Sequence, residues 1–142
     1  VAESRERVRA AIHALGLALP ARKIIINLAP ADILKEGSHF DLPIALGLLV
    51  AMGVLPQDEL AEYVSLGELS LDSRILPVSG VLPASLHANA EGLSLICPEA
   101  NGREAAWSGL ERILAPHSLL SLINHFKGLQ LLSQPEPGAP AK

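Results

Sequence analysis

The chain is poor in cysteine and in aromatic residues. Cys97 is the single cysteine, and aromatic residues make up 3% of the 142 residues. One cysteine excludes an internal disulfide framework and a cysteine-rich metal site, and it favours a reducing, cytoplasmic setting. So few rings disfavour a surface on which single-stranded bases stack. Charged residues are also few, at 18% against 49% hydrophobic, which is typical of a folded domain rather than a disordered chain.

Long apolar runs are absent too. The densest run, residues 42–52, is about half the ~20 residues that a membrane-spanning helix needs, and we see no signal-peptide pattern. We therefore expect no membrane partner. The formal net charge of −4 disfavours a dedicated nucleic-acid-binding domain. Residues 1–23 nevertheless carry five basic side chains and two acidic ones, a net of +3: Arg5, Arg7, Arg9, Arg22 and Lys23 against Glu3 and Glu6.

Motifs for phosphate binding and metal binding are missing. The chain has no Walker A sequence and no Gly-x-Gly-x-x-Gly. The chain has five histidines, namely His13, His39, His87, His117 and His125. They are scattered without the spacing of metal ligands, so we expect no metal site.

One short cluster holds the residue types of a catalytic triad, namely Ser38, His39 and Asp41. A triad normally draws its members from distant segments. Capping of the next helix by Ser38 and Asp41 is the simpler interpretation. Both interpretations stay open at this point.

Hydrophobic periodicity predicts an α/β domain. The first helix has an apolar stripe at Val8, Ala11, Ile12 and Leu15, and Arg7 lies one turn after Glu3, as in an exposed ion pair. A buried strand over 23–28, a loop over 29–39 and an apolar central helix over 42–52 follow. Beyond them we predict strands over 63–71, 74–78, 93–97 and 113–114, with a hairpin turn at 71–74. We also predict helices over 81–90, 101–108 and 118–126, the last of them capped by Ser118.

Both ends of the sequence suggest a longer protein. Residues 129–142 have the proline-rich composition of a linker, which sets a folded domain over residues 1–128. The first residues enter a helix directly, with no methionine and no leading strand. We expect neighbouring segments on both sides.

Arg5 and Arg9 lie one turn apart at the rim of the apolar stripe. They either form a solvated helix face or contact a phosphate backbone or an acidic partner. Arg22 and Lys23 are the other candidates for such a contact.

Four separated motifs carry a resemblance to a known family: residues 3–11 (ESRERVRAA), 27–32 (NLAPAD), 35–47 (KEGSHFDLPIALG) and 66–72 (LGELSLD) with Pro77. In this order they resemble the N-terminal domain of the Mg-chelatase-like AAA+ ATPases, the YifB/ComM group of bacterial competence-related proteins. The resemblance covers residues 1–128. It implies a fold similar to the Lon proteolytic domain and to a ribosomal-protein domain, with a left-handed βαβ crossover.

The resemblance also implies how the Lon chemistry has changed. The position of the Lon serine holds His39, and the position of the Lon lysine holds Ala84. A serine without an amine base is a weak nucleophile, so protease activity is not expected. The alternative is a serine peptidase with a rearranged centre that uses Ser38, His39 and Asp41.

The family suggests a non-catalytic accessory domain of an ATP-driven motor that acts on branched or single-stranded DNA during natural transformation. Its partners would be its own AAA+ module and the other subunits of a homo-hexamer. ATP and magnesium would bind in that AAA+ module, outside this chain. We therefore expect no cofactor within residues 1–142.

Overall fold

The structure, a computed structural model, describes residues 2–17 and 40–136. The strand predicted over 23–28 and the loop predicted over 29–39 lie outside these ranges. In chain order the described helices are α1 (Ala2–Ala14), α2 (Asp41–Ala51), α3 (Gln57–Leu60), α4 (Val81–Ala90), α5 (Gly102–Ala106) and α6 (Leu119–Phe126). The strands are β1 (Tyr63–Ser65), β2 (Glu68–Leu69), β3 (Ile75–Leu76), β4 (Ser94–Ile96) and β5 (Ile113–Leu114).

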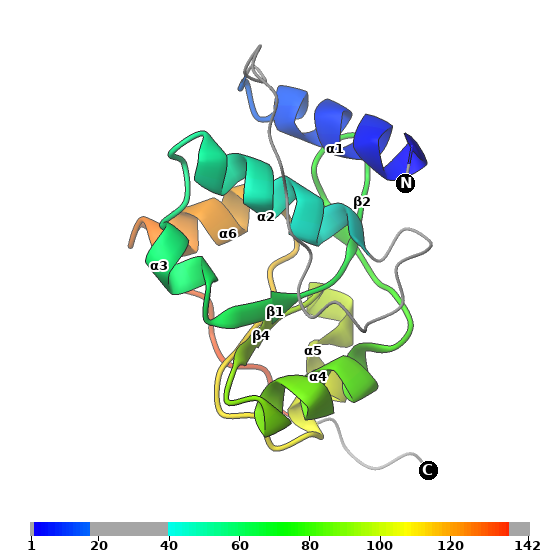
Figure 1. Cartoon of the computed structure of the whole chain (residues 1–142), viewed down its shortest axis with the longest axis vertical. Coiled ribbons are helices and arrows are strands. Elements are labelled where there is room, and N and C mark those ends of the chain that lie inside the picture. Colours follow the sequence, from blue (N-terminus) through cyan, green and yellow to red (C-terminus); the bar gives the residue numbers. More distant parts are fainter. Residues whose placement is uncertain (1, 18–39, 137–142) are drawn as a thin grey trace.

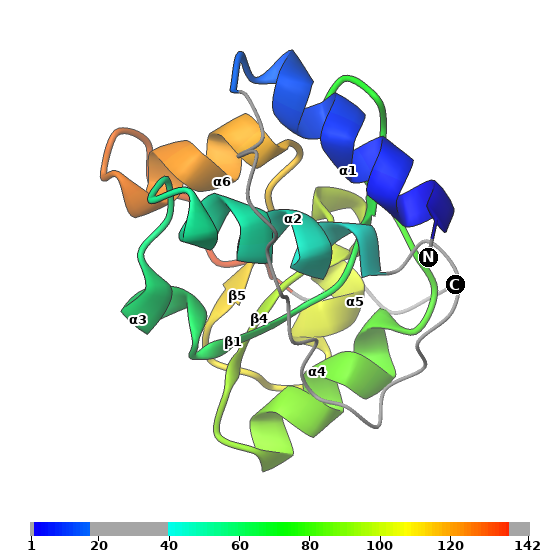
Figure 2. The same cartoon turned by 45° about the horizontal axis from the view of Figure 1, so that its top comes forward.

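A small parallel sheet lies at the centre, with strand order β1-β4-β5. Val64 faces Leu95 across β1 and β4, and Leu95 faces Ile113 across β4 and β5. Helices cover both faces: α1, α2 and α6 lie on one side, and α4 and α5 lie on the other (Figures 1 and 2). The predicted α/β class is therefore confirmed.

Each sheet face builds its own hydrophobic core, because successive side chains of a strand point to opposite faces. Ile96 and Leu114 pack with the buried sides of α1, α2 and α6. Their neighbours Leu95 and Ile113 pack with α4 and α5. The central helix α2 belongs to the first of these cores. Most of the helix is partly covered, and its buried apolar residues lie along one side: Leu42, Ala45, Leu46 and Leu49.

The strand predicted over 63–71 is in fact two strands. β1 pairs with β4, and the chain then leaves the sheet so that β2 pairs antiparallel with β3. The change of partner occurs at Gly67, where a Cβ would lie 3.1 Å from Ile75 Cγ2. A side chain there would crowd the hairpin, so the small residue allows the close approach.

The hairpin turn between β2 and β3 is where the sequence predicts it. Ser73 takes a left-handed φ of 69°. The Arg74 amide donates to the Ser70 hydroxyl at 3.0 Å, and that hydroxyl donates to Asp72. Local polar side chains therefore close the turn.

The last helix also follows its local signal. Ser118 caps α6, and its hydroxyl accepts from the Ser121 amide at 3.1 Å. This agrees with the predicted cap. Within the described ranges no helix has the length and apolar run to cross a membrane.

Candidate functional site

The position that the resemblance assigns to a catalytic lysine lies on α4, and its side chain is part of the hydrophobic core. Ala84 is 5% exposed and packs with Val81 and Leu95. In the described part of the chain the one lysine is Lys127, at the C-terminal end of α6. α4 thus presents a methyl group where the Lon chemistry needs an amine.

Asp41 forms an ion pair and does not cap α2. Phe40 is the N-cap residue of α2, and its side chain forms no capping hydrogen bond. The Asp41 carboxylate is fully buried and accepts from Arg7 Nε at 2.6 Å and from Arg7 Nη2 at 3.1 Å. It also accepts from the Leu69 amide at 3.0 Å. The predicted cap at Asp41 is therefore wrong, because Asp41 lies inside the helix and its carboxylate is held by a charge-assisted bidentate pair.

This arrangement bears on the triad hypothesis. Three donors already converge on the Asp41 carboxylate, so most of its acceptor positions are occupied. Ser38 and His39 lie outside the described residues, as do Arg22 and Lys23.

The sequence did not predict that Arg7 binds Asp41. The sequence suggests a pair with Glu3 on the helix surface, and the structure shows that the Arg7 guanidinium also binds Asp41, 34 residues away. The Glu3 side chain lies outside those described. A sequence spacing of 34 residues gives no helical signal, so this contact depends on the packing of α1 on α2.

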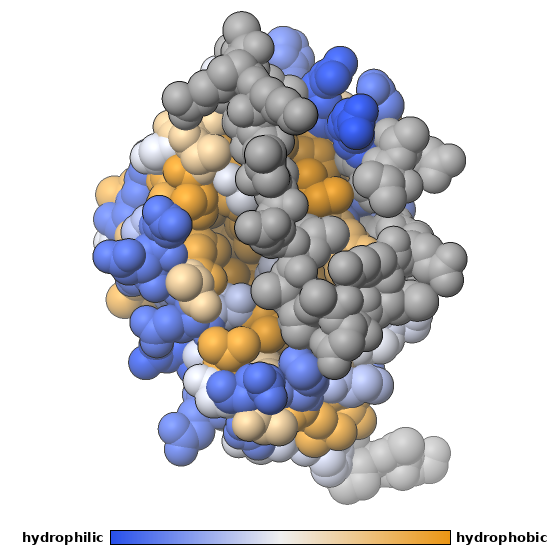
Figure 3. All heavy atoms as spheres, viewed as in Figure 1, coloured by the Kyte–Doolittle hydropathy of each residue, from blue (hydrophilic) through white to orange (hydrophobic). Residues whose placement is uncertain are grey.

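The outer side of α1 carries a net positive charge, with Arg5 and Arg9 exposed beside one glutamate, Glu6. Val8, Ala11 and Ile12 are buried against the core, while Arg5 and Arg9 are exposed one turn apart. Within the described residues neither arginine forms an ion pair. Figure 3 shows hydrophilic side chains grouped over this helix.

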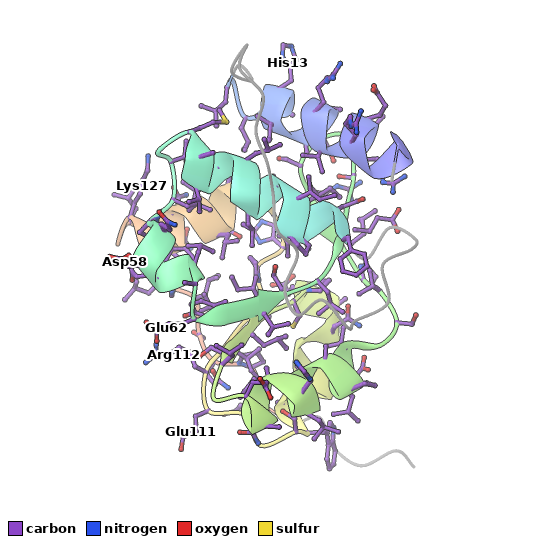
Figure 4. All side chains as sticks on the ribbon, viewed as in Figure 1. His13, Asp58, Glu62, Glu111, Arg112 and Lys127 are labelled. Atoms are coloured by element: carbon purple, nitrogen blue, oxygen red, sulfur yellow. The ribbon has the colours of Figure 1, made fainter. Side chains whose placement is uncertain are left out.

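One histidine extends this surface, and three carboxylates elsewhere in the domain lie away from it. His13 is exposed on α1 one further turn along, and Figure 4 shows it pointing away from the body of the domain. Asp58, Glu62 and Glu111 lie along the side of the molecule away from α1 (Figure 4). An anionic partner approaching α1 therefore does not meet these three carboxylates.

A second polar cluster, which the sequence also did not predict, stabilises the N-terminal end of α4. The buried Asn101 side chain accepts from the Val78 amide and donates to the Val78 carbonyl, both at 3.0 Å. Glu104 accepts from the Leu82 amide at 3.1 Å and from Asn101 at 3.3 Å. A carboxylate near the N-terminal end of a helix is favourable. Because every one of these groups is used, the cluster is structural.

Cysteine and metal chemistry find no support in the described part. Burial raises the pKa of the Cys97 thiol to about 12, so the nucleophilic thiolate is not formed near neutral pH. No group of three or more metal-binding side chains occurs among the described residues.

Comparison with known proteins defines the class. Residues 1–101 match the protein family described as subunit ChlI of Mg-chelatase. The chain therefore belongs to this Mg-chelatase family, which confirms the resemblance carried by the four motifs.

Particular relatives are similar over most of the chain. The YifB protein of Escherichia coli (strain K12) is 39% identical over 137 residues, which are 96% of this chain and 27% of that protein. Competence protein ComM of Haemophilus influenzae (strain ATCC 51907 / DSM 11121 / KW20 / Rd) is 36% identical over 132 residues, which are 93% of this chain and 26% of that protein. The chain thus spans about a quarter of the length of these curated relatives.

Proposed function

We propose that this chain is a non-catalytic accessory domain, with a Lon-like fold, of a Mg-chelatase-like AAA+ ATPase. Its role is to support the assembly or the DNA engagement of an ATP-driven branch-migration motor in natural transformation. Membership of the ChlI family and similarity to a relative named as a competence protein support this proposal.

Two observations support a role without catalysis. The methyl of Ala84 lies in the core where a peptidase would need a lysine. The Asp41 carboxylate is held by Arg7 and the Leu69 amide. With alanine at position 84, a serine that relied on the Lon type of dyad would lack its amine base.

The exposed cationic side of α1 is the observation that carries DNA engagement. Arg5 and Arg9 point out of the domain, unpaired within the described residues, and Arg22 and Lys23 are proposed to add to the same contact. Such side chains attract the phosphate backbone without reading base sequence.

The remaining chemistry is proposed to lie elsewhere in the longer protein. ATP and magnesium bind in its AAA+ module, and the partners of this domain are that module and the other subunits of a homo-hexamer. The proposed compartment is the cytoplasm, where both DNA and ATP are available.

Fluorescence anisotropy of a labelled four-way DNA junction, titrated with this chain at about 50 and about 200 mM salt, tests the proposal. We expect binding that weakens as salt rises. The double variant Arg5→Ala/Arg9→Ala removes two phosphate contacts, so the slope of log K against log salt becomes shallower by about 2.

The matched control is Arg103→Ala/Lys127→Ala, which removes the same charge from exposed positions on α5 and at the end of α6. It leaves the slope nearly unchanged if α1 is the contact. If the slope falls equally in the two double variants, the change in binding follows from net charge alone and not from a contact at α1. Absence of binding at the lower salt would assign the DNA contact to the rest of the protein and leave assembly as the role of this domain.

A further inference from the structure

The segment after α6 folds back onto the domain instead of leaving it. The Leu129 amide donates to the Asn124 carbonyl at 2.9 Å, which turns the chain at the end of the helix. The Leu132 amide then donates to His125 Nδ1 at 2.9 Å. Leu132 is also partly buried against the first core. Residues with linker composition are thereby attached to α6.

Gln134 makes the next attachment, at the edge of the parallel sheet. Its Oε1 accepts from the Ile113 amide at 2.7 Å, and its Nε2 donates to the Leu110 carbonyl at 3.3 Å. β5 is the last strand of the described sheet order, and its bonds to β4 run through Arg112 and Leu114. The Ile113 amide therefore faces the open edge, where an unpaired donor invites pairing with another chain. The Gln134 carboxamide satisfies that donor as a neighbouring strand would.

Pro135 completes the attachment by packing on α5. A Cβ placed on Gly102 would lie 3.1 Å from Pro135 Cβ and 3.2 Å from Ala115 Cβ. The absence of a side chain at Gly102 lets the segment lie close to the helix. The attachment thus has three parts, namely the hydrogen bond from the Leu132 amide to His125, the edge contact of Gln134 and the packing of Pro135.

We propose that residues 129–136 form a latch, an intrachain strap that covers the β5 edge and fixes where the polypeptide leaves this domain. In one respect the proposal rests on the proposed function, namely that a further module follows in the longer protein. Eight latched residues, fully extended, would span about 26–29 Å. Release of the latch therefore lengthens the tether between this domain and the next module by up to that distance.

Hydrogen exchange at the Ile113 amide of this chain tests the latch directly. In Gln134→Ala we expect the Ile113 amide to exchange at least tenfold faster, because it loses its acceptor. The matched control is Gln130→Ala, which removes the same type of side chain from the same segment, where it forms no hydrogen bond with the described residues. Equal exchange of Ile113 in the wild type and Gln134→Ala would overturn the latch.

A second copy could supply the same glutamine by exchanging its tail. We expect protection of Ile113 to be independent of protein concentration, as an intrachain contact requires. Protection that is lost on dilution would show exchange between copies and would also overturn the proposal.

The consequence for the tether is measured in the longer protein, as the distance between a label in this domain and one in the following module. Gln134→Ala should lengthen and broaden the distance distribution, whereas Gln130→Ala should not. Unchanged distances would overturn the role in fixing the exit point. DNA titration fails or succeeds independently of these measurements, so the latch and the proposed function are tested apart.

Discussion

Arg7 on α1 and Asp41 at the start of α2 form a bidentate ion pair, with Arg7 Nε 2.6 Å from Asp41 Oδ2. The carboxylate is fully buried, and the Arg7 side chain is 25% exposed. Since the same carboxylate accepts from the Leu69 amide, one buried group joins α1, α2 and the β2–β3 hairpin.

We expect Arg7→Met to destabilise the domain strongly. Methionine keeps an apolar stem but leaves the Asp41 charge buried without its partner. Breaking a buried pair in this way costs about 3 kcal/mol, the lower end of the usual range, because Arg7 is partly exposed. Urea unfolding measures the change, with the exposed Arg9→Met as the control, for which about 0.5 kcal/mol or less is expected. An equally small effect of Arg7→Met would mean that the pair contributes little.

The central helix makes a second prediction about stability. Leu49 is fully buried and Leu46 is 5% exposed. Leu49→Ala or Leu46→Ala should each cost about 2–5 kcal/mol, because each removes apolar contacts and leaves a cavity in the core around α2. Leu71→Ala is the control, since Leu71 is 65% exposed at the hairpin tip. Denaturation midpoints that do not separate the core variants from the control would contradict the packing.

His125 makes the stability of the domain depend on pH. Burial lowers the pKa of His125 below 6.5, and the Glu59 carboxylate partly opposes that shift. Neutral His125 also accepts the Leu132 amide through Nδ1, which the protonated ring cannot do. Because the pKa is lower in the folded state, the stabilisation is complete above 6.5 and is lost as the pH falls through the folded pKa.

We therefore expect acidification from about pH 7.5 to about pH 5 to lower the denaturation midpoint more in the wild type than in His125→Gln, whose residue 125 does not titrate. The other histidines are common to both proteins, so they do not contribute to the difference between them. The same loss in both proteins would exclude His125 as the cause.

The proposal that the domain has no peptidase activity is tested by covalent labelling. A fluorophosphonate probe should not label the folded chain at Ser38, because Asp41 is engaged by Arg7 and the position of the Lon lysine is Ala84. A fluorophosphonate-reactive serine hydrolase, labelled in the same mixture, is the control for probe activity. Labelling of this chain that Ser38→Ala abolishes would restore the rearranged peptidase as a candidate.

Local signals in the sequence predicted much of this fold. The Ser118 cap, the polar turn at 71–74 and the periodicity of α4 need only near neighbours, so their residue types suffice to indicate them. The family could also be identified from four short motifs, and the match to ChlI over residues 1–101 confirms it. The cationic side of α1 could be predicted as a helix face, because Arg5 and Arg9 are one turn apart.

Such local signals could not predict contacts between distant segments. The alternation over 63–71 could not show that the chain changes partner at Gly67, because a pattern of period two is the same whichever strand lies beside it. The Asp41 carboxylate was assigned to a helix cap, and its real partner lies 34 residues away.

The sequence by itself determined the α/β class, most of the helices, the hairpin and the family, since each depends on residue types at short range or in order along the chain. Only the tertiary structure decided that Asp41 binds Arg7, that Ala84 lies in the core and that Gln134 covers the β5 edge. These depend on which surfaces meet when helices pack on the two faces of the sheet, and a buried charge or an open edge amide takes the partner that packing brings within hydrogen-bond reach.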